Sequence, residues 1–126
     1  MMSGNHADLR ILVADDNHDT ADSMTELLQL EGHQVRTVYD GEAAVSAAVQ
    51  FVPHVAVLDI GMPYMNGYQV ARALCARCPS TLLIAVSGWG TTRDVAAALE
   101  AGFHHHLTKP AKFCAILSLL DDVGRE

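Results

Sequence analysis

Carboxylates, a hydroxyl and a lysine follow short apolar runs at several points of the sequence. Asp15 and Asp16 follow the first run, Asp59 follows the third, Ser87 the fourth and Lys109 the fifth. Carboxylates that are drawn together repel one another, and a hard divalent cation with a preference for oxygen ligands removes that conflict. We therefore expect Asp15, Asp16 and Asp59 to bind Mg²⁺, for which Mn²⁺ could substitute.

An ammonium and a hydroxyl beside such a metal site suit phosphoryl chemistry. A carboxylate can act as a nucleophile and become an acyl phosphate, while fixed cations neutralise the phosphoryl oxygens. The Lys109-Pro110 pair directly after an apolar run is specific, since a cis bond there would hold a tight turn. Simpler explanations exist: Asp15, Asp16 or Ser87 could cap the following helix, and Lys109 could be a solvated surface lysine.

Five apolar runs alternate with five segments of helical pattern. The runs predict strands that are covered on both faces, at Leu9–Ala14, Gln34–Val38, His54–Leu58, Leu82–Val86 and Phe103–Leu107. Helices are predicted around Met24–Leu28 with a stop at Gly32, over Glu42–Val49, Tyr68–Arg77 and Arg93–Ala101, and from Phe113 through Leu120. Strict alternation implies a (βα)5 doubly wound α/β domain with a parallel sheet. Its ligand site is expected outside the carboxyl ends of the strands, where the polar residues gather.

Length and composition indicate one globular domain. The chain has 126 residues, half of them hydrophobic, and a net charge of −7 with only eight basic residues. This charge argues against direct binding of nucleic acid. We see no apolar run near the roughly 18 residues of a membrane span and no secretory signal, so we expect a cytoplasmic protein. We assign residues 1–8 to an N-terminal tail and 9–124 to the domain, with no output domain.

The cysteines do not form a convincing redox or zinc motif. Cys75 and Cys78 make a CxxC near the end of a predicted helix, whereas a redox pair opens a helix. There is no second CxxC to complete a zinc site. With Cys114 they are expected to be ordinary thiols in a reducing compartment.

Four segments resemble the bacterial response-regulator receiver domain. They are ILVADDN at 11–17, VLDIGMPYMNGY at 57–68, AVSGWG at 85–90 and GFHHHLTKP at 102–110, and the resemblance covers residues 9 to about 123. It implies a flavodoxin-like fold with strand order 2-1-3-4-5. It also implies a non-enzymatic signalling role in a two-component phosphorelay, with a histidine kinase or histidine phosphotransferase as donor. The DIGMP and FHHHLTKP variants are similar to receivers of hybrid sensor histidine kinases.

The resemblance implies roles for individual residues around the metal. Asp59 would be the phosphoacceptor. Asp16 would bind Mg²⁺ directly, Asp15 through water, and the backbone carbonyl of Gly61 would be a further ligand. Gly67 would serve the tight turn that leads into the next helix.

The resemblance also implies how the domain would switch. Ser87 and Lys109 would bind the phosphoryl group, and Ser87 would be one switch residue. In many receivers an aromatic residue stands three positions before the lysine and moves inward on activation, but here His106 stands there. The switch could therefore be weaker, pH-dependent or routed differently. The first helix would meet the phosphodonor, and the fourth helix, last strand and last helix would serve output or homodimerisation.

Three consecutive histidines precede this lysine. In a strand His104 and His106 would point to one face and His105 to the other, so the three cannot close on one metal ion. We expect only His106 to matter, as the second switch residue.

Two other functions were weighed. A phosphatase of the haloacid dehalogenase type also uses Asp, Mg²⁺ and Lys, but needs a second acid two residues after the nucleophile, where Gly61 stands. A degenerate receiver that only binds partners would not need the full set of acidic, hydroxyl and lysine residues.

Overall fold

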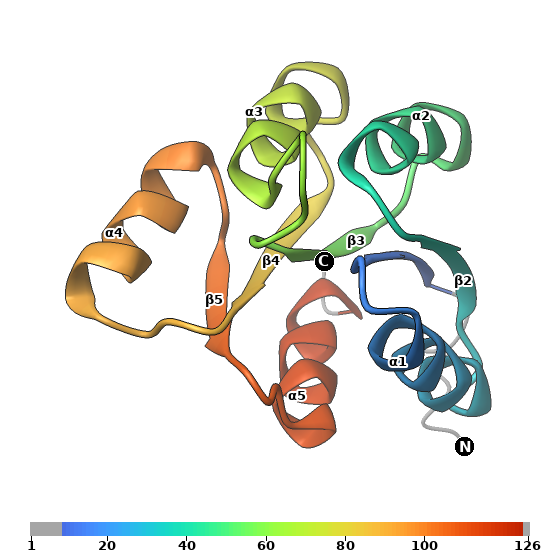
Figure 1. Cartoon of the computed structure of the whole chain (residues 1–126). Helices are drawn as coiled ribbons and strands as arrows, with labels where there is room; N and C mark the ends of the chain where they lie inside the picture. The colour runs from blue at the N-terminus through green and yellow to red at the C-terminus, as the bar shows by residue number, and fades with distance from the viewer. Residues whose placement is uncertain (1–8, 125–126) are drawn as a thin grey trace.

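The computed structural model describes residues 9–124 and shows a parallel sheet with helices on both faces (Figure 1). The strands are β1 (Arg10–Ala14), β2 (Gln34–Val38), β3 (Val55–Asp59), β4 (Leu82–Ser87) and β5 (His105–Thr108). The helices are α1 (His18–Leu30), α2 (Gly41–Phe51), α3 (Gly67–Arg77), α4 (Thr92–Ala101) and α5 (Phe113–Gly124). The strand order is β2-β1-β3-β4-β5, so the predicted fold class and order are confirmed. The proposed tail, residues 1–8, lies outside the described residues.

The last three strands each end one residue later than predicted, and in β3 and β4 this places site residues within the sheet. Asp59 is the last residue of β3 and pairs with Val86, while Ser87 ends β4 and pairs with Thr108. The start of β5 was predicted too early. Phe103 is buried and its N–H donates to the carbonyl of Ala98, so it closes the end of α4 instead of beginning the strand.

Alternating strand residues feed two separate hydrophobic cores. On one face the sheet packs against α2, α3 and α4, and on the other against α1 and α5. Leu12 and Leu58 face the first core and Ile11 and Val57 the second, because successive side chains of a strand point to opposite faces. Each fully buried aliphatic side chain contributes about 1.5–3 kcal/mol relative to exposure. Two-sided burial therefore holds the strand ends at fixed positions.

The helix caps come from residues other than the predicted site residues. The side chain of Asn17 accepts a hydrogen bond from the N–H of Thr20 at 3.0 Å and caps α1. Thr91 caps α4 and forms a capping box with Asp94. Neither Asp15 nor Ser87 is therefore needed as a cap, and the simpler explanation for these two residues is wrong.

Close packing and turn geometry fix the loops at the carboxyl edge of the sheet. A Cβ at Gly67 would lie 2.7 Å from the carbonyl oxygen of Asp59, so only glycine lets α3 begin so close to the end of β3. The Lys109–Pro110 peptide bond is cis. Within the described residues, no helix is long and apolar enough to cross a bilayer.

Candidate phosphoryl and metal site

Three carboxylates meet where the strand order reverses, between β1 and β3. Asp15 follows β1, Asp16 is next to it, and Asp59 ends β3. One oxygen from each lies within 4.8 Å of the others. Asp15 and Asp59 are buried, with exposed fractions of 6% and 5%, whereas Asp16 is exposed. The loops that leave β1 and β3 run to helices on opposite faces of the sheet. At this point a crevice opens whose lining includes Asp15 and Asp59.

Lys109 brings a positive charge to these carboxylates from the loop after β5. Its Nζ lies 3.1 Å from Oδ1 of Asp59 and 3.6 Å from Oδ2 of Asp15. Partial burial disfavours the ammonium, but the hydrogen bond and charge of Asp59, followed by those of Asp15, outweigh burial and raise the pKa of Lys109. The lysine is therefore charged throughout the physiological range.

Backbone N–H groups orient two of the carboxylates. The N–H of Asn17 donates to Oδ1 of Asp15 at 2.9 Å, and the N–H of Gly61 donates to Oδ1 of Asp59 at 3.1 Å. Burial raises the pKa of Asp15, the Asn17 bond opposes that rise, and the charge of Asp59 adds to it. The ionised form of Asp15 is thus disfavoured by its surroundings.

The donor set fits a hard divalent cation. Carboxylate oxygens are the ligands that Mg²⁺ prefers, and an exposed carboxylate beside two buried ones leaves room for the waters that this ion retains. The single positive charge of Lys109 does not balance the negative charge of three clustered carboxylates, and a bound divalent cation would supply the missing positive charge. The Gly61 carbonyl has no contact that assigns it as a ligand, so that role stays a prediction.

The hydroxyl of Ser87 is closed onto its own loop. Its Oγ donates to the carbonyl of Trp89 at 2.7 Å and accepts from the N–H of Trp89 at 3.0 Å. Ser87 is 4% exposed and ends β4, next to Asp59 on β3. Its proton is therefore committed to Trp89 and must be released before Ser87 can donate to a ligand at the acidic cluster.

Two of the three consecutive histidines have different surroundings. His104 stands before β5, and its Nδ1 accepts a hydrogen bond from the N–H of Leu83 at 2.9 Å. His106 pairs with Ala85, which faces the core under α2, α3 and α4. Its Nε2 is buried and makes no hydrogen bond to any described residue. Within residues 9–124, the only cluster of potential metal ligands is the aspartate group.

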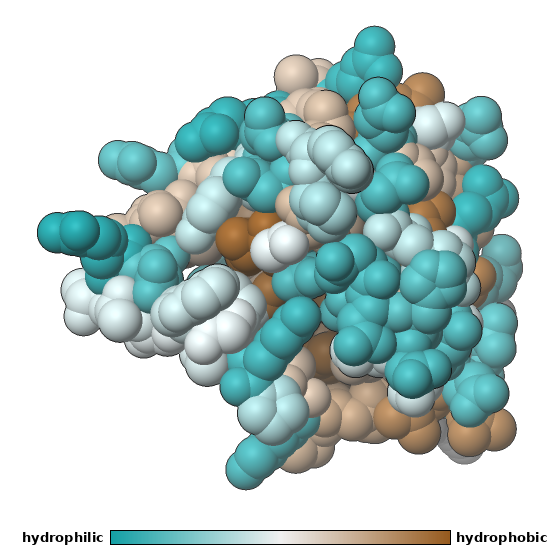
Figure 2. All heavy atoms as spheres, in the orientation of Figure 1, coloured by the Kyte–Doolittle hydropathy of each residue, from teal (hydrophilic) through white to brown (hydrophobic). Residues whose placement is uncertain are grey.

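A cavity beside the aspartates was not anticipated from the sequence. It has a volume of about 360 Å³ and lies between α1 and the loop after β5, with Asp59 and Lys109 at its polar end. Ala21, Met24 and Pro110 contribute to its apolar wall. Figure 2 shows this face of the molecule, where hydrophilic side chains dominate and hydrophobic atoms appear between them near the centre. In the sequence, the only indication of this cavity was the recurrence of small and apolar residues on α1.

Known proteins share both the sequence pattern and the fold. The family model of the response regulator receiver domain matches residues 11–121. The transcriptional regulatory protein PrrA of Mycobacterium tuberculosis is 38% identical over 101 residues, which cover 80% of this chain and 43% of PrrA. The DNA-binding response regulator MtrA of Mycobacterium leprae is 34% identical over 103 residues, 82% of this chain and 45% of MtrA. The chain thus spans less than half the length of these relatives.

Solved structures extend the similarity to nearly the whole chain. The receiver domain of the Francisella response regulator 1452 superposes with a TM-score of 0.87 at 24% identity, covering 94% of this chain and 98% of that one. The BeF3-activated receiver domain of DrrB, a Thermotoga maritima protein, superposes with a TM-score of 0.86 at 27% identity, and the match covers 94% of this chain and 99% of that one. With the family model matched over most of its length, the chain belongs to the response regulator receiver domain family.

Proposed function

We propose that this receiver domain accepts a phosphoryl group on Asp59 from a phosphohistidine of a histidine kinase or histidine phosphotransferase. One observation carries the proposal: Asp59 is buried among Asp15, Asp16 and Lys109, so its carboxylate is oriented and its surroundings are charged for phosphoryl transfer. The domain then signals by a change of conformation. It catalyses its own phosphorylation and dephosphorylation and no reaction of another substrate.

The contacts of Asp59 support a proposal for the attacking atom. The Gly61 N–H and the Lys109 ammonium both hold Oδ1, so Oδ2 is the nucleophile. Oδ2 forms a bond to phosphorus while the P–N bond to the donor imidazole breaks, and the electron pair stays on the imidazole nitrogen. Lys109 pairs with a phosphoryl oxygen. Mg²⁺, when bound by the aspartates, supplies charge neutralisation at the phosphoryl oxygens.

Ser87 and His106 are the proposed switch residues. A phosphoryl oxygen on Asp59 attracts the proton that Ser87 donates to Trp89, so the loop after β4 rearranges when the bond to Trp89 breaks. A Cβ at Gly90 would meet the Thr108 side chain, so this loop packs directly against the end of β5. Movement of the loop is thereby passed to the strand that carries His106.

The donor docks along α1. The cavity beside Asp59 continues into a groove lined by Thr20, Met24, Leu27, Ala111 and Phe113, which suits a helix whose histidine reaches Asp59. Homodimerisation through the α4–β5–α5 face is a second proposal, supported by the 55% exposed Leu99 on α4.

The expected origin of the domain in a hybrid kinase and its expected location in the cell are still predictions. The named relatives are transcriptional regulators, which gives the expected hybrid-kinase origin no support, so that origin stays a prediction. The same holds for the cytoplasmic location and for the single domain over residues 9–124. At a net charge of −7 we propose no direct contact with nucleic acid.

Mass spectrometry tests the acceptor. Wild type and Asp59→Asn are treated with phosphoramidate and Mg²⁺, and only wild type is expected to gain about 80 Da, the mass of one phosphoryl group. A phosphorylated Asp59→Asn species would show that another residue is the acceptor. No adduct on wild type, together with unchanged Trp89 fluorescence in beryllofluoride, would favour a receiver that only binds partners.

A further inference from the structure

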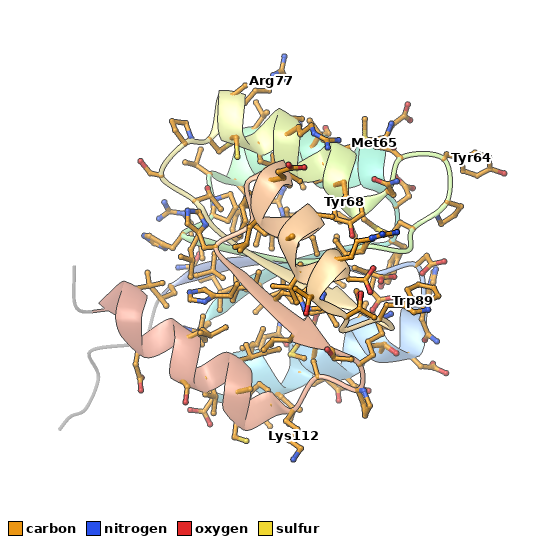
Figure 3. All side chains as sticks on the ribbon, turned by 90° about the vertical axis from the view of Figure 1, so that its left-hand side faces the viewer. Tyr64, Met65, Tyr68, Arg77, Trp89 and Lys112 are labelled. Atoms are coloured by element: carbon orange, nitrogen blue, oxygen red, sulfur yellow. The ribbon has the colours of Figure 1, made fainter. Side chains whose placement is uncertain are left out.

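Tyr64 combines an unusual backbone conformation with complete exposure of its ring. It lies in the loop between β3 and α3 and has a φ of 66°, in the left-handed region that bulky residues rarely adopt. Its exposed fraction is 102%, so the ring packs against nothing in the described part of the chain. Figure 3 shows Tyr64 projecting from the molecule at the same end as Trp89.

The surrounding loop imposes this conformation. The N–H of Gly67 donates to the carbonyl of Ile60 at 3.0 Å, and the N–H of Met65 donates to that of Pro63 at 2.7 Å. Met65 is fixed in turn against the start of α2, where a Cβ at Gly41 would collide with it. Glycine or asparagine would adopt this φ at lower cost. Tyrosine therefore carries a backbone cost that no internal contact of its ring offsets, and such strain points to a function outside the fold.

The position of Tyr64, on a loop that begins at Asp59, indicates which kind of protein its ring would contact. Its loop begins at Asp59, which is only 5% exposed, so a phosphohistidine must enter the crevice to reach the carboxylate. The donor protein around that histidine must then lie over the loops at the carboxyl edge of the sheet. Tyrosine and tryptophan are the residues most enriched at the energetic centres of interfaces. Because Tyr64 is exposed on one of these loops, it lies in the donor's path.

We propose that the Tyr64 ring is a contact and specificity residue for the phosphohistidine-bearing donor protein. This inference rests on the proposed function. A tyrosine side chain has only two rotatable bonds, so ordering its ring against the donor costs little conformational freedom for the contact area it supplies. The ring touches the donor protein and not the reacting atoms. It therefore affects phosphotransfer from a protein but not from a small molecule.

The test compares two phosphodonors on one set of variants. The protein donor is the phosphorylated histidine phosphotransfer domain, from a panel of such domains, that phosphorylates wild type fastest, and the small donor is phosphoramidate. We expect Tyr64→Ala and Tyr64→Gly to lower kcat/KM for the protein donor about tenfold, the loss typical of an interface centre, and Tyr64→Phe to stay close to wild type. The phosphoramidate rate should be unchanged in all three. Val49→Ala, which shortens an apolar side chain of 44% exposure on α2, is the matched control and should behave as wild type with both donors.

Each contrary result has a distinct meaning. Wild-type kcat/KM of both Tyr64→Ala and Tyr64→Gly with the protein donor would overturn the inference and leave the proposed function standing. An equal loss with both donors would also overturn it, because the ring would then act on the chemistry. A loss in Tyr64→Ala that Tyr64→Gly restores would assign the effect to the backbone and not to the ring. If neither donor phosphorylates wild type, the proposed function itself fails.

Discussion

Replacing Asp15 by Asn should stabilise the metal-free domain and weaken its response to Mg²⁺. Asp15 and Asp59 are both buried, with carboxylate oxygens no more than 4.8 Å apart. At an effective dielectric constant of about 20, two charges at that separation repel by about 3.5 kcal/mol. The attraction of Asp15 to Lys109 across 3.6 Å is smaller, since the lysine side chain is 34% exposed and screening reduces such pairs to about 1 kcal/mol.

The net gain from Asp15→Asn is therefore about 2 kcal/mol at pH 7, or about 6–10 °C in Tm for a chain of this size. The direction in which the pKa of Asp15 is shifted agrees with this expected stabilisation. Burial raises that pKa above its ordinary value, so stability falls as the pH rises from the ordinary value through the folded one, and at pH 7 the ionised carboxylate is unfavourable. An amide oxygen can still accept the bond from the Asn17 N–H, so the loop after β1 is preserved.

Thermal and urea unfolding in EDTA and in saturating Mg²⁺ measure both effects. In EDTA the variant should be the more stable protein. Mg²⁺ at 100 times its dissociation constant adds about 2.7 kcal/mol to a protein that binds it only when folded, so wild type should gain more than Asp15→Asn. Asp19→Asn removes the same charge from an exposed position in the first turn of α1 and should be slightly less stable than wild type. An Asp15→Asn variant that is less stable than wild type in EDTA would refute the argument that clustered carboxylates strain this site.

Two further predictions concern Lys109 and His54. Lys109→Ala should keep the fold and still be phosphorylated, but beryllofluoride should no longer change the fluorescence of Trp89, the only tryptophan; a wild-type change would contradict the proposed coupling. Burial, followed by the charge of Arg10, lowers the pKa of His54 below its ordinary value of 6.5, so His54 contributes stability that is present above pH 6.5 and lost as the pH falls. The difference between the urea midpoints at pH 7.5 and pH 5.5 should therefore be larger in wild type than in His54→Gln, and equal differences would contradict this reasoning.

The strand order and the gathering of polar residues at one edge were predictable because they depend on local patterns. Continuous apolar runs indicate strands that are buried on both faces, and alternation with helices leaves few topologies. Element ends were less predictable. Phe103 has the residue type of a strand, yet its N–H closes α4, and this depends on the packing of α4 against the sheet. Caps such as Asn17 and Thr91 were likewise visible only once the helix starts were known.

Contacts between distant loops were beyond the sequence. The sequence placed Ser87 near the site but could not show that Trp89 holds its hydroxyl. It also gave no sign that Tyr64 adopts a left-handed conformation, since tyrosine is an unusual residue for that region. Both features arise from loop geometry that the surrounding packing imposes, and neither follows from residue type or spacing.

Under the proposed function, the closed Ser87–Trp89 arrangement limits how strongly a phosphoryl group on Asp59 would bias the domain. A ligand shifts a conformational equilibrium only by its differential interaction with the two states. Here the exchange replaces a hydrogen bond from Ser87 to a neutral carbonyl by one to a charged phosphoryl oxygen, a gain of about 1 kcal/mol from the difference between neutral and charged acceptors. That gain alone shifts the equilibrium roughly five- to tenfold. A sharper response therefore has to come from groups that move with the loop, and the contact of Gly90 with Thr108 makes β5, with His106, the element best placed to supply it.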